Sequence, residues 1–384
     1  MKALLPIFVL LLVFISCDPQ QRSRQTGLDE TNPIFNADHA QIQHPKNVIL
    51  MIGDGMGITQ ITAGMYRNGN NLHLERFSRV GLHKSYAFDN LVTDSAAGAT
   101  AFSAGIKTYN GAIGVDPDTN AVRTILEDAE AAGMPTGLVA TSTIVHATPA
   151  SFIAHQPYRK MYDEIAADFL DTEVDLFIGG GRNYFMNRQD GRELYADLRA
   201  RNYAVDDFLG KSLQNITPDL SKNFAYLTSN DDPVPVALGR DYLVPATELA
   251  VDFLDQRAAQ NANGRGFFLM VEGSQIDWGG HSNNSEYIIT EMIDFDNAIG
   301  RVLDFAERDG ETLVIVTADH ETGGYAINPG STMDSIVGAF TSDYHTATLI
   351  PVFAYGPGAE LFAGIYENTA IHRKMQLALQ FVRQ

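Results

Sequence analysis

Six short apolar runs recur along the chain, and each is bounded by glycine, proline or polar residues. Such runs are typical of strands in a parallel sheet that is covered on both faces, because neither face then carries polar side chains. Longer segments with helical periodicity alternate with the runs, which predicts an α/β fold, a three-layer sandwich with a mostly parallel central sheet flanked by helices. Residues 210–235 show no regular pattern, and we expect a loop-rich surface insertion there. The predicted strands are residues 47–52, 136–141, 174–178, 267–272, 312–317 and 351–355, and the predicted helices are residues 122–132, 162–170, 192–201, 246–262, 286–309 and 371–382.

The N-terminus carries a separate apolar run at residues 3–15, which is too short to span a bilayer and is typical of a secretory signal. The only cysteine of the chain, Cys17, follows it, and the three residues before Cys17 resemble a loose bacterial lipobox. This resemblance implies a lipoprotein-type signal peptide over residues 1–17, a lipid anchor at Cys17 and a flexible tether over residues 18–45. A plain signal peptide with an incidental cysteine is the alternative. Either interpretation predicts an exported protein, periplasmic or held at the outer membrane or cell surface of a bacterium.

The composition limits the partners that this protein can have. With 384 residues, of which 45% are hydrophobic, the chain can bury the core of one large α/β domain or two smaller ones. Its net charge of −20 argues against nucleic acid and against an anionic membrane surface, because both would be repelled. A small anionic substrate remains compatible with this charge, since bound metal ions can reverse the local field.

A stretch of small residues from Val92 to Thr100 predicts a loop that turns into a helix at Ser95. The first turn of a helix presents free N–H groups and the positive end of the helix dipole, so a serine there can meet a phosphate. Taken alone, Asp94 or Ser95 could equally be an ordinary N-cap.

Acids and histidines cluster at the predicted carboxyl ends of the strands, where ligands bind in sheets of this kind. Asp54 follows the first predicted strand, Glu272 ends a later one, and Asp319-His320 follow another. Each could be a turn residue, a loop acid or a helix cap, but their joint placement predicts a metal site. Asp277 and His281 are spaced i, i+4, which lets both face one ion if a helical turn forms there.

In these residues the sequence resembles the alkaline phosphatase family. The resemblance covers the chain from about residue 47 to its C-terminus, so it implies a single catalytic domain over residues 46–384. The motifs that carry it are Ile52–Gly57, Thr93–Ala101, His146–Ala150, Glu272-Gly273, Asp277 with His281, and Thr317–Gly324.

The resemblance implies hydrolysis of phosphate monoesters through a phosphoserine intermediate on Ser95, which would also contact zinc. Arg159 would clamp the phosphate, and Asp94 would position Arg159 or a backbone amide. Two zinc ions and one magnesium ion per chain are implied. The ligands of the first zinc would be Asp277, His281 and His345, those of the second Asp54, Asp319 and His320, and those of the third ion, normally magnesium, Asp54, Thr148 and Glu272.

This ligand set agrees with elementary chemistry. Three protein ligands leave a zinc ion one position open for substrate or water, and two zinc ions about 4 Å apart can hold both oxygens of an in-line displacement. Arg159 can grip two phosphate oxygens at once, which a lysine could not do.

Two positions depart from the commonest pattern of the family. Trp278 stands where many relatives have lysine or histidine, so we expect the chain to retain phosphate less tightly. His146 replaces an aspartate of some relatives near the third ion, where an imidazole could favour zinc.

Only twenty-four residues separate His320 from His345, where larger relatives insert a crown subdomain. We therefore expect an open site, and a smaller interface in the homodimer that the resemblance implies. His372 opens the last predicted helix, and we expect it to face solvent.

Two other functions are considered. A phosphodiesterase or sulfatase on the same superfamily fold is one, but Arg159 and a third metal site favour monoesters. A non-catalytic metal- or phosphate-binding lipoprotein is the other, but it would have no need of a nucleophile such as Ser95.

Overall fold

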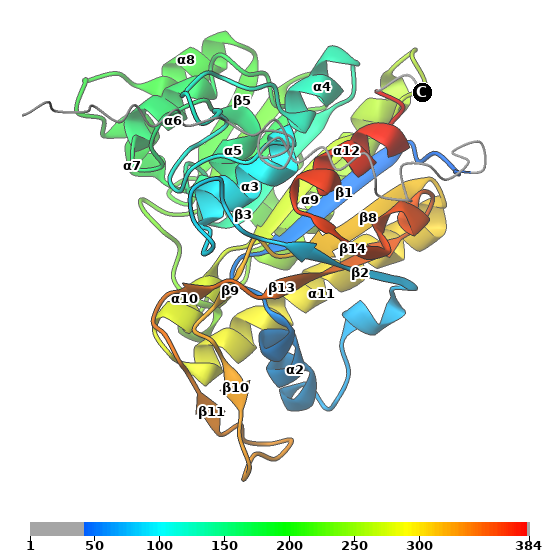
Figure 1. Cartoon of the computed structure of the whole chain (residues 1–384). Coiled ribbons are helices and arrows are strands. Elements are labelled where there is room, and N and C mark those ends of the chain that lie inside the picture. The colour runs from blue at the N-terminus through cyan, green and yellow to red at the C-terminus, as the bar shows by residue number, and fades with distance from the viewer. Residues whose placement is uncertain (1–41, 382–384) are drawn as a thin grey trace, which may run out of the picture.

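The computed structural model describes residues 42–381, whose centre is a ten-stranded sheet in the order β14-β2-β13-β8-β1-β7-β3-β4-β6-β5 (Figure 1). Only β13 pairs antiparallel within this sheet, as far as the described residues go. The predicted signal peptide, Cys17 and most of the predicted tether lie outside the described residues. The strands of the sheet are β1 (Asn47–Gly53), β2 (Arg79–Lys84), β3 (Thr136–Thr143), β4 (Leu176–Gly180), β5 (Tyr203–Asp207), β6 (Asn223–Leu227), β7 (Phe268–Gly273), β8 (Thr312–Thr317), β13 (Leu349–Tyr355) and β14 (Gly364–Glu367).

Helices cover both faces of the sheet, which confirms the predicted three-layer fold (Figure 1). Along β1 the side chains alternate between two cores: Leu50 packs with α3, α4, α5 and α12, whereas Met51 packs with α2, α9 and α11. A central strand of this kind is apolar throughout because both of its faces are buried. The helices are α2 (Ile58–Arg67), α3 (Ser95–Ala104), α4 (Ile125–Ala131), α5 (Ala147–Ile153), α6 (Tyr162–Asp168), α7 (Arg182–Met186), α8 (Leu194–Ala200), α9 (Leu243–Gln260), α10 (Gln275–His281), α11 (Ser285–Asp309) and α12 (Thr369–Ala378).

Two short ladders lie outside the main sheet, between β8 and β13. The ladder β9 (Glu321–Thr322) with β12 (His345–Thr346) forms the base of a loop, and β10 (Ala326–Ile327) with β11 (Gly338–Ala339) forms its tip. Figure 1 shows this loop projecting from the body of the molecule beside α2. The segment between His320 and His345 is therefore a hairpin rather than a subdomain, as its length predicts.

The six predicted strands and six predicted helices are present, but some bounds differ. The helix predicted at residues 246–262 begins three residues earlier as α9, because Pro245 is tolerated in a first turn where its missing N–H has no helical partner. The helix predicted from residue 122 begins only at Ile125, where the Thr124 hydroxyl and the Glu127 carboxylate form a capping box.

Two predictions were wrong. The region 210–235 is not loop throughout, because β6 lies within it as a fully buried strand between β4 and β5. His372 does not face solvent: it is 7% exposed, and its Nδ1 lies 2.9 Å from the carbonyl oxygen of Ser103. The first turn of α12 packs against α3, so its polar residue takes a backbone partner there.

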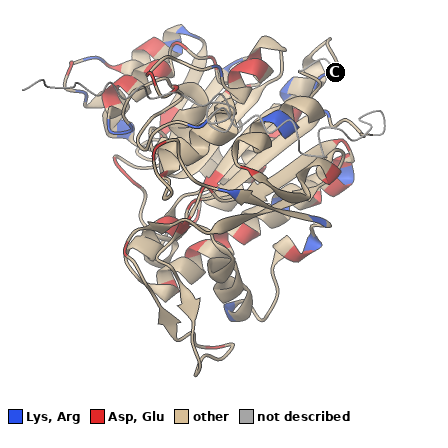
Figure 2. Ribbon diagram, viewed as in Figure 1, with Lys and Arg blue, Asp and Glu red and all other residues tan. Residues whose placement is uncertain are grey.

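Acidic residues outnumber basic ones, 47 to 27, and lie on both helical layers (Figure 2). No helix among residues 42–381 combines the length and the apolar character that crossing a membrane requires.

Candidate active site

The three central strands β8, β1 and β7 end at one edge of the sheet and carry acids there. Ile52 of β1 is in register with both Glu272 of β7 and Thr317 of β8, so Asp54, Glu272 and Asp319 come together beyond the strand ends. All three carboxylates are completely buried. The predicted clustering is confirmed.

Several oxygens of these buried carboxylates lack hydrogen-bond donors. Within the described part of the chain, both oxygens of Asp54, Oδ2 of Asp319 and Oε1 of Glu272 have no hydrogen-bond partner. Burial and the neighbouring acids Asp319, Asp277 and Glu272 raise the pKa of Asp54 well above its usual value, and burial raises the pKa of Asp319 to about 7. A buried group of acids in which several oxygens have no donor is costly unless cations compensate it, so these residues fit a metal centre.

A second group of donors surrounds Asp277. His281 Nε2 lies 3.3 Å from Asp277 Oδ2 and 3.2 Å from His345 Nε2, and His345 Nε2 lies 3.6 Å from Asp277 Oδ1. Ligands placed about 2.1 Å from a zinc ion in tetrahedral geometry are about 3.4 Å apart, which is close to these three distances, two of which end on different oxygens of Asp277. With one donor atom taken from each residue, Asp277 and His345 group with His320, all within 4.8 Å of one another. Asp277 and His281 meet because α10 supplies the predicted helical turn.

Backbone carbonyls fix the orientation of two of these imidazoles. His281 Nδ1 lies 2.7 Å from the Asp343 oxygen, and His345 Nδ1 lies 2.8 Å from the Thr93 oxygen. When Nδ1 donates its hydrogen, the Nε2 lone pair points at the other ligands, which is the usual second contact of a metal-bound histidine.

His320 connects the two groups. Its Nε2 lies 3.2 Å from Asp319 Oδ2 and 3.5 Å from Asp54 Oδ1, and its ring stacks on that of His345 with centroids 3.5 Å apart. Burial and the neighbouring His345 lower the pKa of His320 well below its usual value. A neutral imidazole is the form that ligates metal.

The third group contains a residue beyond the three that the resemblance implies. Donor atoms of Asp54, Glu272 and His146 lie within 4.8 Å of one another. Burial raises the pKa of Glu272 to about 7, against the lowering effect of nearby hydroxyls that include that of Thr148. Burial lowers the pKa of His146 to about 3, which leaves its ring neutral. His146 therefore joins this group as a fourth potential ligand.

Ser95 begins α3 as predicted, and its hydroxyl lies next to His320 of the metal-ligand groups. Its Oγ is 3.4 Å from His320 Nε2, and the residue is 2% exposed. Asp94 is the N-cap: its Oδ1 accepts from the Ala97 amide at 3.0 Å, and its Oδ2 accepts from Arg159 Nη1 at 3.0 Å. Both roles predicted for Asp94 are thus present, and one carboxylate fixes the start of the helix and the arginine together.

Small residues in α3 allow close packing at the site. A Cβ at Gly98 would lie 2.9 Å from the Cβ of Asp319. Gly98 therefore allows the loop that follows β8 to approach α3 closely.

The two unusual positions lie side by side. The rings of Trp278 and His146 are edge-to-face with centroids 6.2 Å apart, and Arg159 Nη2 is 3.4 Å from His146 Nε2. Burial works against the charge of Arg159, but Asp94 and Asp54 hold its pKa above the usual value.

Several residues of the site are not marked by a pattern in the sequence. The Thr322 hydroxyl donates to Asp277, and the backbone carbonyls of Thr93 and Asp343 orient histidines. Backbone carbonyls carry no sequence signal, although Thr322 lies within the Thr317–Gly324 motif.

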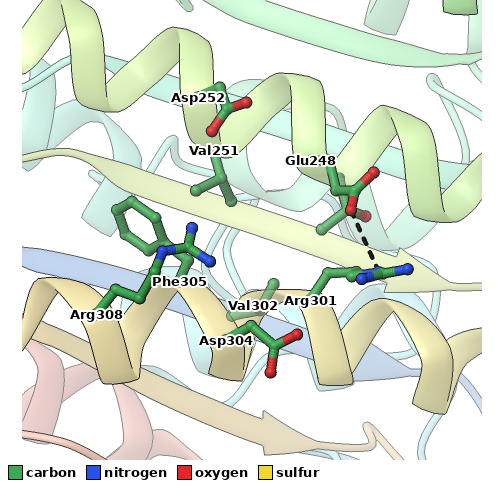
Figure 3. Close-up of a pocket in the computed structure, with 9 residues that line it drawn as sticks. Glu248, Val251, Asp252, Arg301, Val302, Asp304, Phe305 and Arg308 are labelled. Carbon is green, nitrogen blue, oxygen red and sulfur yellow. Dashed lines mark ion pairs between the residues drawn. The ribbon is translucent and has the colours of Figure 1, made fainter.

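A separate groove lies between α9 and α11 (Figure 3). The residues of α11 that line this groove belong to the last turns of the helix, just before β8 begins. The groove therefore lies near the amino ends of the parallel strands, at the opposite edge of the sheet from the acids above. Its Arg301 is paired with Glu248 at 3.2 Å, and Asp304 is paired with Arg76 at 3.0 Å. We therefore place the functional site at the carboxyl ends of the strands.

The alkaline phosphatase family model matches residues 45–339. Alkaline phosphatase 3 of Bacillus subtilis (strain 168) is 34% identical over 421 aligned positions, which cover 88% of this chain and 89% of that protein. The chain belongs to the alkaline phosphatase family. It is therefore an enzyme that hydrolyses phosphate monoesters, and a phosphoserine intermediate is general to this family.

Other alkaline phosphatases agree with this assignment. That of Escherichia coli (strain K12) is 32% identical, over 94% of this chain and 91% of that protein. The structure of the alkaline phosphatase from the Antarctic bacterium TAB5 is 44% identical with a TM-score of 0.81, and covers 89% of this chain and all of that chain. A variant of the TAB5 enzyme is described with magnesium bound in its M3 site.

Proposed function

We propose that the Ser95 hydroxyl is the nucleophile of this phosphatase. The observation that carries the proposal is its place at the N-terminus of α3, 3.4 Å from His320 Nε2 and next to the Asp94–Arg159 pair. The first-turn amides of α3 and the Arg159 guanidinium both favour a dianionic phosphate at this point.

The three groups of ligands fit two zinc ions and one magnesium ion. Their donor atoms are carboxylate and hydroxyl oxygens and imidazole nitrogens, several of which have no hydrogen-bond partner in the described chain. Asp277 raises the pKa of His281 to about 9, so zinc bound there would displace a proton from this imidazole. When bound, zinc would favour the ionised form of the Ser95 hydroxyl and compensate the charge on the oxygen of the departing alcohol. We assign the first zinc to Asp277, His281 and His345, the second to Asp54, Asp319 and His320, and magnesium to Asp54, Thr148 and Glu272 with His146 beside them.

The chain itself orients the reaction. Arg159 is held by Asp94 before substrate arrives, so it can bind two phosphate oxygens with little further loss of side-chain freedom. The Ser95 oxygen forms a bond to phosphorus while the bond from phosphorus to the ester oxygen breaks, and the alcohol leaves with a proton. Water then attacks phosphoserine, releasing inorganic phosphate and restoring the serine.

Replacing Ser95 by alanine tests this role. We expect Ser95→Ala to lower kcat for p-nitrophenyl phosphate by about a thousandfold or more, roughly 4 kcal/mol, because no covalent intermediate can form. Acid quench with ³²P-labelled substrate should label the wild type and not the variant.

Ser103→Ala is the matched control. Ser103 lies in the same helix, but its hydroxyl donates to the Ser151 carbonyl at 2.6 Å, away from the phosphate position. It should keep most of the activity. Undiminished activity in Ser95→Ala would contradict the proposed nucleophile, and faster hydrolysis of bis(p-nitrophenyl) phosphate than of the monoester would contradict the monoester preference.

We also propose that the enzyme acts outside the cytoplasm as a homodimer tethered by lipid at Cys17. Support comes from the apolar run that precedes this single cysteine and from the resemblance to the family. Mass spectrometry of the mature N-terminus and sedimentation of the purified protein test these two statements, and an unmodified Cys17 or a monomer would contradict them.

A further inference from the structure

Glu321 follows His320 directly but belongs to none of the three ligand groups. It is 5% exposed, and its two oxygens accept four hydrogen bonds. A carboxylate has about four acceptor positions, so Glu321 is saturated by the protein, in contrast to Asp54. The donors are Gln60 Nε2 at 2.7 Å, the Tyr325 amide at 3.0 Å, the Gly324 amide at 3.1 Å and the Thr346 hydroxyl.

These four donors belong to segments that carry metal ligands. Gln60 lies in the first turn of α2, directly after the loop that carries Asp54. Thr346 is adjacent to His345 in β12, and β12 pairs with β9, in which Glu321 itself lies. One side chain therefore connects the loops of Asp54, His320 and His345, which are far apart in the sequence.

The side chain of Glu321 packs directly against the backbone of Gly57. A Cβ at Gly57 would lie 2.4 Å from Glu321 Cγ, although the backbone of Gly57, with φ of −80°, is accessible to any residue. Glycine is thus required here by the approach of Glu321 and not by the conformation of the chain.

We propose that Glu321 is a positioning residue that holds His345 against His320 and so sets the affinity of the Asp277–His281–His345 group for zinc. This inference rests on the ligand assignment proposed above. Glu321 does not contact that group directly. It acts through β9 and β12, because the stacking of the His320 and His345 rings at 3.5 Å depends on how these two strands are held.

Glu321→Gln is the first test, because the amide nitrogen that replaces one oxygen cannot accept a hydrogen bond. We expect zinc affinity, measured on apoenzyme by competition with a chromogenic chelator, to fall about tenfold to a hundredfold, as is typical when a partner of a ligand is altered. Excess zinc should restore kcat, and KM should stay unchanged, since Glu321 does not contact substrate.

Gly57→Ala is a second test that keeps every hydrogen-bonding group and displaces Glu321 by contact alone. It should lower zinc affinity in the same direction. Thr346→Val removes one of the four bonds and should have a smaller effect. Glu286→Gln is the matched control, because that glutamate is exposed and pairs only with Arg67 at the surface, at 2.5 Å; its zinc affinity should equal that of the wild type.

The outcomes separate this inference from the proposed function. Wild-type zinc affinity in Glu321→Gln and Gly57→Ala, or a loss of kcat that excess zinc does not restore, would overturn the role of Glu321. If Glu321→Gln does not fold, Gly57→Ala and Thr346→Val decide by the same criteria. Wild-type zinc affinity in His345→Ala would instead show that the ligand assignment is wrong.

Discussion

At the carboxyl ends of β8, β1 and β7 the chain buries acids without an arginine or lysine in ion-pair contact, among the described residues. Beside α11, in contrast, Arg240 pairs with the buried Glu291 and the partly buried Asp294. Arg240 Nη2 lies 2.5 Å from Glu291 and 2.8 Å from Asp294, and Glu291 also accepts from the Val236 amide at 2.9 Å. Arg240 Nε and Nη1 lack partners in the described chain, and its single positive charge compensates part of the charge of the two acids. The first cluster needs cations from outside the protein, and the second carries its own.

This difference in charge compensation distinguishes a ligand-binding site from a cluster that only supports the fold. A buried ion pair that the protein completes by itself joins the segments that supply it, here the loop before α9 and helix α11. A buried cluster with uncompensated charge is stable only when a ligand completes it, so binding and stability are coupled.

Removing the metal ions should have the largest effect, because it takes away the cations on which the first cluster depends. We expect exhaustive chelation to abolish phosphatase activity and to lower the unfolding temperature, because the acids at the strand ends then repel one another. Zinc with magnesium should restore both, and calorimetry with activity measured at each step checks this. Full activity after chelation would contradict the proposed metal centre.

Removing the cation from the second cluster should lower the free energy of unfolding, whereas removing an acid from the first cluster should raise it. Arg240→Met leaves the buried Glu291 and the partly buried Asp294 without a cation, and we expect it to destabilise the protein by about 3 to 5 kcal/mol. Asp319→Asn removes one of the repelling charges, so the apoenzyme should gain about 1 kcal/mol. Urea unfolding of the two apo variants measures both changes, and destabilisation of the same size in both would remove the distinction.

Lys374 offers the reverse case, a buried amine without an acid in ion-pair contact in the described residues. It is 1% exposed, its Nζ donates to the Leu361 carbonyl at 2.5 Å and lies 3.3 Å from the Tyr366 ring centroid, and burial lowers its pKa to about 7.

The sign of the effect follows from this lowered pKa. Above pH 10.5 the amine is neutral in both states, whereas between about pH 10.5 and 7 only the unfolded chain takes up the proton, so stability falls as pH falls through this range. We expect Lys374→Met to remove this slope, which one proton limits to about 1.4 kcal/mol per pH unit. Urea unfolding at pH 7 and 10 measures it, with the exposed Lys84→Met as control, and an unchanged slope would contradict a neutral lysine.

The smallest expected effect comes from giving the site a cation of its own. Trp278→Lys places an ammonium next to Asp277 and His146, and we expect inorganic phosphate to inhibit this variant several-fold more tightly, about 1 kcal/mol. Tighter inhibition of the wild type would contradict the expected weak retention of phosphate.

The sequence predicted the parts of the molecule in which local pattern and tertiary role agree. The central strands are apolar on both faces, and the acids that follow them are conspicuous because they interrupt such runs. Strand β2 and the edge strand β14 beside it were not predicted, since their exposed faces mix polar and apolar side chains. Contacts such as Gln60 with Glu321 join residues 261 positions apart, and no local pattern records them.

The two-residue ladder between β9 and β12 has a practical consequence. Because it fixes the start and the end of the hairpin together, the chain between Tyr325 and Tyr344 can change in length without moving either end. Lengthening a loop whose ends are held adds only a slowly growing entropic cost, about 0.6 kcal/mol for each doubling. The tip at β10 and β11 is therefore a suitable place to insert a foreign segment, such as a substrate-recruiting domain or an affinity tag, into an enzyme that remains intact.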